Sequence, residues 1–282
     1  MNQIWIWTPI VVFSALVLSL ALWRWNDKRW ERKIFNDLKA ANMDPRLFDL
    51  SLIEDLPEPA QRFFKYAIAE GTPLHNYTEV SMTGQLALGT KKPLKYSDMK
   101  ATQILAAPHG FVWSVSMKLF VGSDGLYKNF SWTRFWLFKC IPVARVTGRD
   151  HFRSAYGRLL ADSLIWAPAT MLPNEHVQWQ LLGKDSVRVT VHHKNFMQSI
   201  DVIVSANGQA KRIVFERWSN ENPDRVYRSQ PFGGDLSEFK RFGGYCLPTK
   251  VIAGNHYGTD DYIPFFKAKV THINFPAPSD GK

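Results

Sequence analysis

The sequence predicts an α+β protein: an N-terminal transmembrane helix, then a large curved antiparallel β-sheet, a half-barrel-like meander whose concave face a helix closes. Three observations lead to this prediction. Residues 4–23 contain no charged side chain. From Tyr77 onward, short runs alternate between apolar and polar residues and are separated by turn residues, as in antiparallel strands. Only Asp150 to Leu172, in the middle of these runs, repeats its apolar residues at helical spacing.

The uncharged segment is long enough to cross a bilayer, because a helix of this length spans about 30 Å, the thickness of the hydrocarbon core. Trp5, Trp7, Trp23 and Trp25 lie at its two ends, where indole rings favour the headgroup level. A secretory signal peptide would have a charged start and a small-residue cleavage site. A lipoprotein signal would need a cysteine directly after the apolar run, and the first cysteine is Cys140. We therefore expect an uncleaved single-pass anchor.

The charges beside this segment bear on its orientation and its surroundings. Residues 24–33 hold five basic and two acidic side chains. The positive-inside rule then places the C-terminal domain in the cytoplasm, although long domains can translocate whatever their flanking charge. The chain carries a formal charge of +10. Because this charge is densest beside the anchor, it favours a lipid bilayer with anionic headgroups as the partner, and we expect no nucleic acid.

We divide the chain into four parts. Residues 1–23 are the transmembrane anchor, residues 24–54 a basic juxtamembrane helix and linker, residues 55–275 the curved β-sheet domain, and residues 276–282 a disordered tail. Aromatic residues make up 14% of the chain, which excludes disorder in the large domain.

The elements of the domain follow from local signals. A helix is expected over residues 30–41, and a second one from Leu56-Pro57 to Gly71, since proline suits a first turn and glycine a C-cap. Strands are then expected at residues 77–88, 96–107, 110–119, 119–121, 126–146, 177–182, 186–192, 198–205, 210–218, 225–231, 235–242, 246–254 and 263–273. The sequence Gly122-Ser123-Asp124-Gly125 is interpreted as a turn. About a dozen strands, each pairing with its predecessor, form a sheet that must twist and curl.

The helix predicted near residues 150–172 is the feature that closes the curl. Its apolar residues either fill the concave face as core, which is the more common role of such a helix, or line a cavity for a hydrophobic ligand. The candidate ligand-lining residues are Trp113, Phe152, Tyr156, Leu160, Leu164, Trp166, Trp179 and Trp218. The charges of Glu216-Arg217-Trp218 and Asp224-Arg225, at the ends of two consecutive strands, are consistent with a cavity mouth or with a solvated ion pair.

Motifs for catalysis or cofactor binding were sought and not found. The phosphate-binding patterns GxxxxGK[ST] and GxGxxG are absent, and so is the zinc motif HExxH. His192-His193 and Asp150-His151 are adjacent pairs without a third ligand at a useful spacing. Cys140 and Cys246 are expected to be buried, reduced thiols. We therefore assign no catalytic residue, no metal and no cofactor.

The ordered series of motifs resembles a known family. The segments that carry the resemblance are Leu56-Pro57, Met82-Thr83-Gly84, Phe111-Val112-Trp113, residues 165–173 (IWAPATMLP), Trp179 and residues 243–249 (GGYCLPT). Over residues 55–275 they look like an uncharacterised bacterial family of membrane-anchored proteins, a domain of unknown function. The order of strands and helices is similar to the half-barrel of periplasmic lipoprotein carriers, and this resemblance implies a cavity for acyl chains. It also implies the periplasmic side of the bacterial cytoplasmic (inner) membrane, against the charge rule.

The favoured hypothesis is a membrane-anchored, non-enzymatic protein that binds a lipid or another hydrophobic ligand in the concave face of the sheet. An enzyme acting on a lipid-like substrate at the membrane surface is the first alternative, and His, carboxylate and hydroxyl groups converging in the cavity would favour it. A structural or assembly subunit of a membrane complex is the second, and an exposed apolar patch outside the cavity would favour that.

Overall fold

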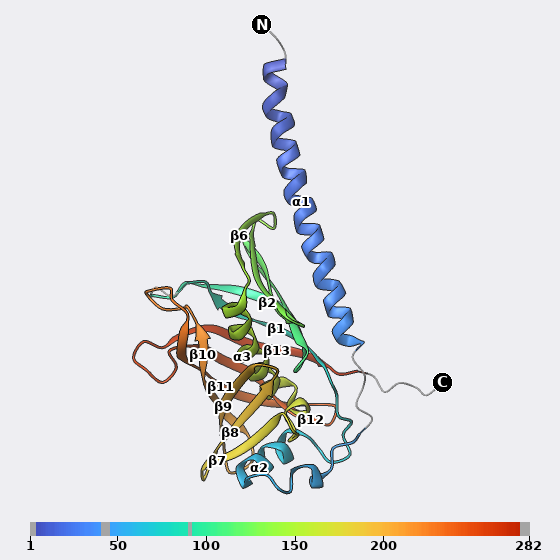
Figure 1. Ribbon diagram of the computed structural model, residues 1–282, viewed down its shortest axis with the longest axis vertical. Helices are drawn as coiled ribbons and strands as arrows, with labels where there is room; N and C mark the ends of the chain where they lie inside the picture. Colours follow the sequence, from blue (N-terminus) through green and yellow to red (C-terminus); the bar gives the residue numbers. More distant parts are fainter. Residues whose placement is uncertain (1–3, 41–45, 90–91, 277–282) are drawn as a thin grey trace, which may run out of the picture.

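The computed structural model describes residues 4–40, 46–89 and 92–276 (Figure 1). It contains the helices α1 (Ile4–Lys39), α2 (Glu58–Ala67) and α3 (Arg149–Trp166) and the short 3-10 helices η1 (Leu50–Ile53) and η2 (Pro168–Met171). The strands are β1 (Thr78–Ala87), β2 (Tyr96–Ala106), β3 (Gly110–Met117), β4 (Phe120–Tyr127), β5 (Phe130–Leu137), β6 (Ile141–Val146), β7 (Val177–Gly183), β8 (Ser186–His193), β9 (Phe196–Val204), β10 (Ala210–Ser219), β11 (Arg228–Phe242), β12 (Tyr245–Asn255) and β13 (Ile263–Asn274). The predicted tail, residues 276–282, lies outside the described residues apart from Pro276.

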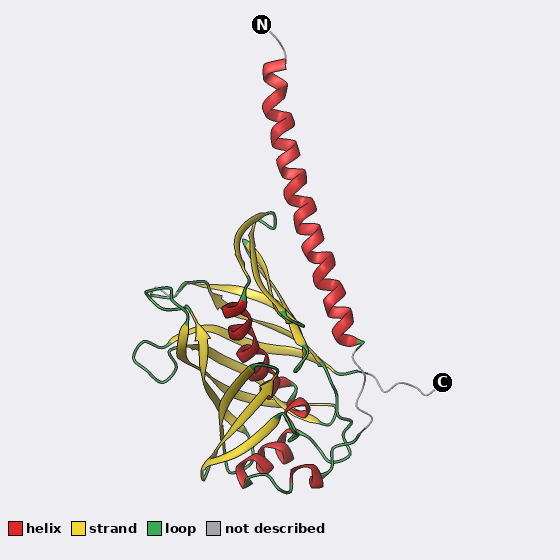
Figure 2. Ribbon diagram, in the orientation of Figure 1, coloured by secondary structure: helices red, strands yellow, loops and turns green. Residues whose placement is uncertain are grey.

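The thirteen strands form one antiparallel sheet in the order β6-β5-β4-β3-β2-β1-β13-β12-β11-β10-β9-β8-β7. Two meanders, β1 to β6 and β7 to β13, therefore join through the pairing of β1 with β13. The consecutive strands β6 and β7 lie at opposite edges, and α3 connects them across the concave face (Figure 2). The predicted fold class, an open curved antiparallel sheet with a helix inside it, is confirmed.

The interpretation of Gly122-Ser123-Asp124-Gly125 as a turn is wrong, because these residues lie inside β4. The glycines are needed there for packing and not for a turn. A Cβ atom on Gly125 would lie 2.3 Å from the indole of Trp132, and one on Gly122 would lie 2.6 Å from the ring of Phe135. The two glycines make room for aromatic rings of β5, so the strand continues where the composition indicated a break. Likewise β11 is one strand where two were expected.

Helix α1 continues from the apolar segment through the predicted juxtamembrane helix without a break. Its second half packs on the convex face of β2 to β5, where Ile34 and Leu38 are buried against Ile104, Val112 and Trp132. This packing explains why aromatic and basic residues alternate along one face of β5. Trp132, Arg134 and Trp136 face α1, whereas Ser131 and Thr133, at the alternate positions, face α3.

The first half of α1 extends past the sheet domain and makes no buried contact (Figure 1). Within the described part of the chain, α1 alone is long and apolar enough to cross a membrane. Side chains such as Val11, Phe13 and Leu18 are more than half exposed.

The two cysteines are unpaired. Cys246 is half-buried, but Cys140 is exposed in the turn between β5 and β6, so the expectation of two buried thiols is wrong for Cys140. The hairpin formed by β5 and β6 lies next to α1 at the end of the domain from which the apolar half of the helix projects (Figure 1). The tip of this hairpin is exposed to solvent: Phe138, two residues before Cys140, is 61% exposed.

Candidate functional site

A cavity of about 490 Å³ lies between α3 and the concave face of the sheet. It runs along one face of α3 from His151 to Trp166, which is about 22 Å of helix. The opposite wall comes from β1 and β10 to β13 and is largely apolar, with Ile213, Phe265 and Phe266 among its residues. Loop residues between β10 and β11, from Asn220 to Tyr227, form part of the lining. The volume lies within the range of about 300–1,000 Å³ that is typical of small-molecule sites.

Polar side chains line one flank of this cavity, and the first group of them centres on Arg158. Its guanidinium makes ion pairs with Asp124 of β4 and with Asp162, one helical turn further along α3. Asp162 also accepts a hydrogen bond of 2.8 Å from the amide of Gln103 on β2. Burial lowers the pKa of Arg158, but the two carboxylates outweigh it and raise the pKa above its ordinary value. Both carboxylates are thus held by partners from the protein.

The second group is a hydrogen-bonded chain through His151, at the start of α3. Its Nδ1 lies 2.8 Å from Oγ of Ser131 and its Nε2 lies 2.8 Å from Oγ1 of Thr133. Thr133 in turn donates to Oδ1 of Asp124 at 2.8 Å. Because a carboxylate only accepts, the single hydroxyl proton of Thr133 goes to Asp124, and Nε2 of His151 must donate to Thr133. Nδ1 then accepts from Ser131, which assigns the neutral Nε2–H tautomer to this histidine.

Burial supports this neutral state of His151. It lowers the pKa of the imidazole below its usual value, and the charges of Arg217 and Arg158 add to the effect, while Asp124 opposes it. Ser131 is only 2% exposed and is absent from the cavity wall. The nitrogen that is free to accept a proton therefore faces a buried serine and not the cavity.

Arg217 on β10 is the third polar feature of the cavity. Its Nε donates to Oγ of Ser154 on α3 at 3.2 Å, and its guanidinium carbon lies 5.0 Å from the centre of the Phe232 ring. Among the described residues no carboxylate forms an ion pair with it. Burial lowers the pKa of this arginine and the nearby charge of Arg158 lowers it further, while the charges of Asp124, Asp162 and Glu221 oppose the effect. An arginine keeps its proton even so, which leaves a cation without a counter-ion at the cavity wall.

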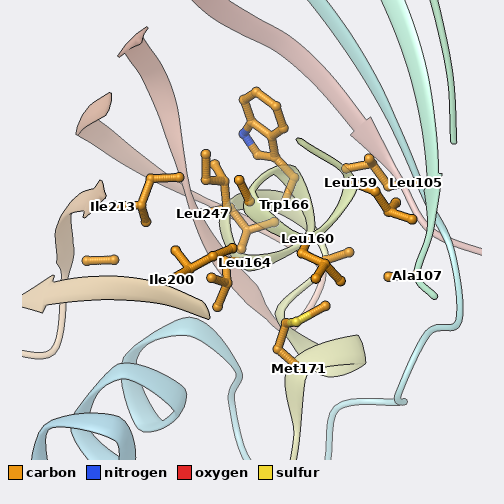
Figure 3. Close-up of a cluster of buried hydrophobic side chains, with 14 of the residues drawn as sticks. Leu105, Ala107, Leu159, Leu160, Leu164, Trp166, Met171, Ile200, Ile213 and Leu247 are labelled. Atoms are coloured by element: carbon orange, nitrogen blue, oxygen red, sulfur yellow. The ribbon is translucent and has the colours of Figure 1, made fainter. Parts of the chain in front are cut away.

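The residues proposed from the sequence as ligand-lining are divided by the structure. Trp113 of β3 and Trp166 at the end of α3 line the cavity. The other six lie elsewhere: Phe152, Tyr156, Leu160 and Leu164 are buried on the remaining faces of α3, Trp179 packs on α2, and Trp218 donates its indole N–H to Asp150. Leu160 and Leu164 lie among buried side chains such as Ile200 and Met171 (Figure 3).

The cavity follows a different flank of α3 from most of the residues proposed from the sequence, and the difference has a physical reason. The strongest apolar stripe of α3 packs against the sheet as core, whereas the cavity follows the flank that holds Ser154, Arg158 and Asp162. Helical spacing alone relates those three residues, at i, i+4 and i+8, and this signal was available in the sequence. The sequence also indicated the charge of Arg217, near the end of its strand, as consistent with a cavity mouth, and Arg217 lines the cavity. Asp124 was hidden by the interpretation of its segment as a turn.

No group of three or more His, Cys, Asp or Glu side chains within residues 4–40, 46–89 and 92–276 is placed to hold a metal ion. The polar flank is built from arginine–carboxylate pairs and hydroxyl groups. Such groups suit hydrogen bonding to a polar head group better than metal coordination.

The fold and the cavity together define a class of protein: an open half-barrel that holds a helix and, beside it, a cavity with one polar and one apolar flank. The chain belongs to a family of unknown function (DUF6544), whose model matches residues 46–268. The predicted resemblance to an uncharacterised family is thereby confirmed. No curated protein matches the chain.

Three solved structures are among those to which the chain shows a distant similarity. A LolA superfamily protein from Nitrosomonas europaea is 10% identical with a TM-score of 0.44, and the match covers 79% of this chain and 94% of that one. A domain assigned to outer membrane lipoprotein sorting, from Vibrio parahaemolyticus, is also 10% identical, with a TM-score of 0.37 and coverage of 83% and 93%. A DUF1329 family protein from Desulfovibrio piger is 9% identical with a TM-score of 0.35, covering 71% and 86%.

Proposed function

We propose that this protein binds a lipid or another hydrophobic ligand in the cavity beside α3 while α1 anchors it to a membrane. The observation that carries the proposal is the cavity itself: about 490 Å³, elongated along the helix, with an apolar wall of β1 and β10 to β13. Solvation of so much apolar surface is unfavourable, and an alkyl chain that displaces the water gains about 25 cal/mol for each Å² it buries.

The test uses the full chain in nanodiscs and a photoactivatable probe with a sixteen-carbon chain that carries a diazirine. We expect peptides of α3, β12 and β13 to be crosslinked, as identified by mass spectrometry. The variant Ala253→Phe places a ring in the cavity from β12 and should reduce the labelling. Ala206→Phe, in the exposed turn between β9 and β10, is the matched control and should label like the parent protein. Labelling confined to α1 would overturn the proposal.

Membrane anchoring rests on the exposed apolar half of α1 and on its rigid connection to the domain. Trp23 packs edge-on against Trp136 of β5 at 5.7 Å, and Arg145 of β6 stacks on Trp23 at 4.6 Å. These contacts hold the β5–β6 hairpin at the base of the apolar segment. The exposed residues Phe138 and Ile141 at its tip favour contact with the same bilayer surface.

The side of the membrane can be read with a native thiol. Cys140 is exposed in the β5–β6 turn, whereas Cys246 is half-buried. A membrane-impermeant maleimide that modifies intact spheroplasts places the domain on the outer side of the cytoplasmic membrane. Modification only after permeabilisation places it in the cytoplasm. The variant Cys140→Ser, which retains Cys246, identifies the labelled residue in either case.

An enzyme acting on a lipid-like substrate is a second candidate, favoured by the convergence of His151, Thr133 and Asp124 at the cavity wall. The direction of these hydrogen bonds weakens the enzyme hypothesis. The accepting nitrogen of His151 is bonded to Ser131, which is buried and does not line the cavity. Ester hydrolysis by the purified protein that His151→Gln abolishes would establish this second function. Hydrolysis that persists in the variant would come from another source.

A further inference from the structure

The arginines of the sheet domain differ in how their charges are compensated. Arg158 has two carboxylate partners, and Arg225 at the β10–β11 loop pairs with Glu221 at 3.4 Å. On the outer surface Arg212 pairs with Asp235 at 3.1 Å. Arg217 lines the cavity between these groups and is held only by a serine hydroxyl and an aromatic ring. Its charge is therefore balanced by no short-range partner within the described residues.

Arg217 is half-buried. An unpaired cation in such a position costs free energy, and a folded protein retains one mainly where a partner arrives from outside. The way Arg217 is held indicates what that partner is. Ser154 engages Nε, and neither terminal nitrogen has a hydrogen-bond partner among the described residues, so both can donate to a ligand at the cavity wall. Two parallel N–H donors match the two oxygens of a carboxylate or a phosphate group. The ring of Phe232 fixes the plane of the guanidinium from one side.

The surrounding charges limit the partner to one negative charge. Asp124 and Asp162 face the same cavity, and both are already saturated by Arg158, Thr133 or Gln103. They form no ion pair with Arg217, but together with Glu221 they place negative charge within electrostatic reach of it, so a second negative charge on the partner would be repelled. Beyond Arg217 the wall continues as Phe232, Phe265 and Phe266, which offer nothing but apolar contact.

We propose that the cavity selects a singly charged anionic amphiphile, whose carboxylate or phosphodiester group binds the free fork of Arg217 and whose alkyl chain lies along the apolar wall. This inference rests on the proposed function, since it names the class of ligand that the same cavity takes. A neutral lipid lacks the group that Arg217 requires. A free anion such as acetate lacks the chain that fills the remainder of the 490 Å³.

The experiment compares photoactivatable probes that share one sixteen-carbon diazirine chain and differ in their head groups: a carboxylate, a monoanionic methyl phosphodiester and a primary alcohol. Each labels the full chain in nanodiscs of a zwitterionic lipid, and the yield at cavity peptides is measured. Arg217→Gln should reduce labelling by the two anionic probes about 10- to 100-fold, the loss typical of one charge-assisted pair, and leave the alcohol unchanged. Arg217→Lys keeps the charge but lacks the two parallel N–H donors, so its labelling by the anionic probes should lie between that of the parent protein and that of Arg217→Gln.

Arg212→Gln is the matched control, because Arg212 lies on the same strand with its side chain paired outside the cavity. It should label like the parent protein with every probe. The anionic probe that gives the higher labelling yield identifies the source of the ligand: the carboxylate probe indicates a fatty acid, and the phosphodiester probe indicates a phospholipid. Equal labelling by acid and alcohol in the parent protein, or an equal loss of both in Arg217→Gln, overturns the anionic selectivity alone. Absence of cavity labelling by all three probes overturns the proposed function as well.

Discussion

The two faces of the curved sheet use the same residue type in opposite ways. On the convex face, Arg134 and Arg145 reach α1 and are matched by Asp27 and Glu31, with nitrogen–oxygen distances of 2.6 to 3.2 Å. On the concave face, Arg217 has a serine and a phenyl ring but no carboxylate partner. A charge that the chain neutralises itself fixes two of its own elements together. A charge that the chain leaves open is available to a ligand.

The convex network is deeply buried, which makes it sensitive to the loss of one member. The side chain of Arg134 is 10% exposed, and Glu31, which pairs with it, also accepts a hydrogen bond of 2.5 Å from Ser123. Removing one partner of such a network leaves the other charge buried and unpaired.

The largest expected effect is therefore that of Arg134→Leu. We expect it to lower the free energy of unfolding by about 3–5 kcal/mol, the usual cost of breaking a buried pair from one side. Urea unfolding of the parent and variant proteins measures the difference. Hydrogen exchange across residues 24–39 should rise at the same time, because the helix loses its attachment to β5. Unchanged exchange there would mean that the apolar contacts of α1 suffice to hold it.

Arg188→Leu serves as the control for this comparison. Arg188 pairs with Asp201 through two hydrogen bonds of 2.6 and 2.9 Å, but its side chain is 42% exposed. An exposed pair contributes about 0–1 kcal/mol, so this variant should unfold almost like the parent protein.

The next effect concerns Gly125 of β4, which leaves room for the indole of Trp132 on the neighbouring strand β5. In Gly125→Ala the new methyl group would lie 2.3 Å from the Trp132 indole and 2.9 Å from the carbonyl oxygen of Phe111. Trp132 must then move toward α1, and overpacking of this kind costs about 1–3 kcal/mol. Thermal unfolding checks the loss of stability. Gly183→Ala, whose methyl group would meet only the Ser186 hydroxyl at 3.1 Å, is the control.

The same segment shows what could be predicted from the sequence. Period-two alternation predicted the antiparallel sheet, and a single helical stretch predicted α3, because both patterns are local. The function of Gly125 depends on Trp132, which pairs with it across the strands, and no local pattern encodes that contact. The composition of residues 122–125 is that of a turn, and no local pattern places Asp124 beside the cavity.

The choice of residues on α3 was limited in a similar way. An apolar stripe is the surface that a helix most often buries, and the stripe of Phe152 and Leu160 is indeed buried, in the core. The cavity adjoins the neighbouring flank, where Arg158 is stabilised by carboxylates from both α3 and β4. Only the fold brings Asp124 and Arg158 together, 34 residues apart in the chain.

A smaller effect of opposite sign is expected for Arg217→Leu. Because the guanidinium has no ion-pair partner in the unliganded protein, its replacement by an apolar side chain should leave the free energy of unfolding unchanged or raise it by up to about 1 kcal/mol. The same urea experiment compares this variant with Arg134→Leu. A loss of about 3 kcal/mol, as for a buried pair, would show that Arg217 is a structural cation and that the two faces do not differ.

The smallest expected effect is a change in how stability depends on pH. Burial lowers the pKa of His151 from its ordinary 6.5, so between pH 6.5 and the lower folded value the unfolded chain binds a proton that the folded protein does not. Stability from this group is therefore complete above pH 6.5 and is lost as the pH falls, with a slope of at most about 1.4 kcal/mol per pH unit. Protonation would also reverse the bond between Ser131 and Nδ1, because Nδ1–H would then donate to the serine hydroxyl.

His151→Gln should remove this part of the slope, because a glutamine amide can still donate to Thr133 and accept from Ser131 without titrating. His75 and His193, whose pKa values burial also lowers, contribute with the same sign in both proteins, so the difference between the two unfolding curves from pH 8 to pH 5 isolates His151. Parallel curves would mean that His151 gains or loses no proton on folding. A smaller loss of stability toward low pH in His151→Gln than in the parent would place the acid-sensitive group on the concave face, beside the arginine that we assign to the ligand, and not in the network that holds α1.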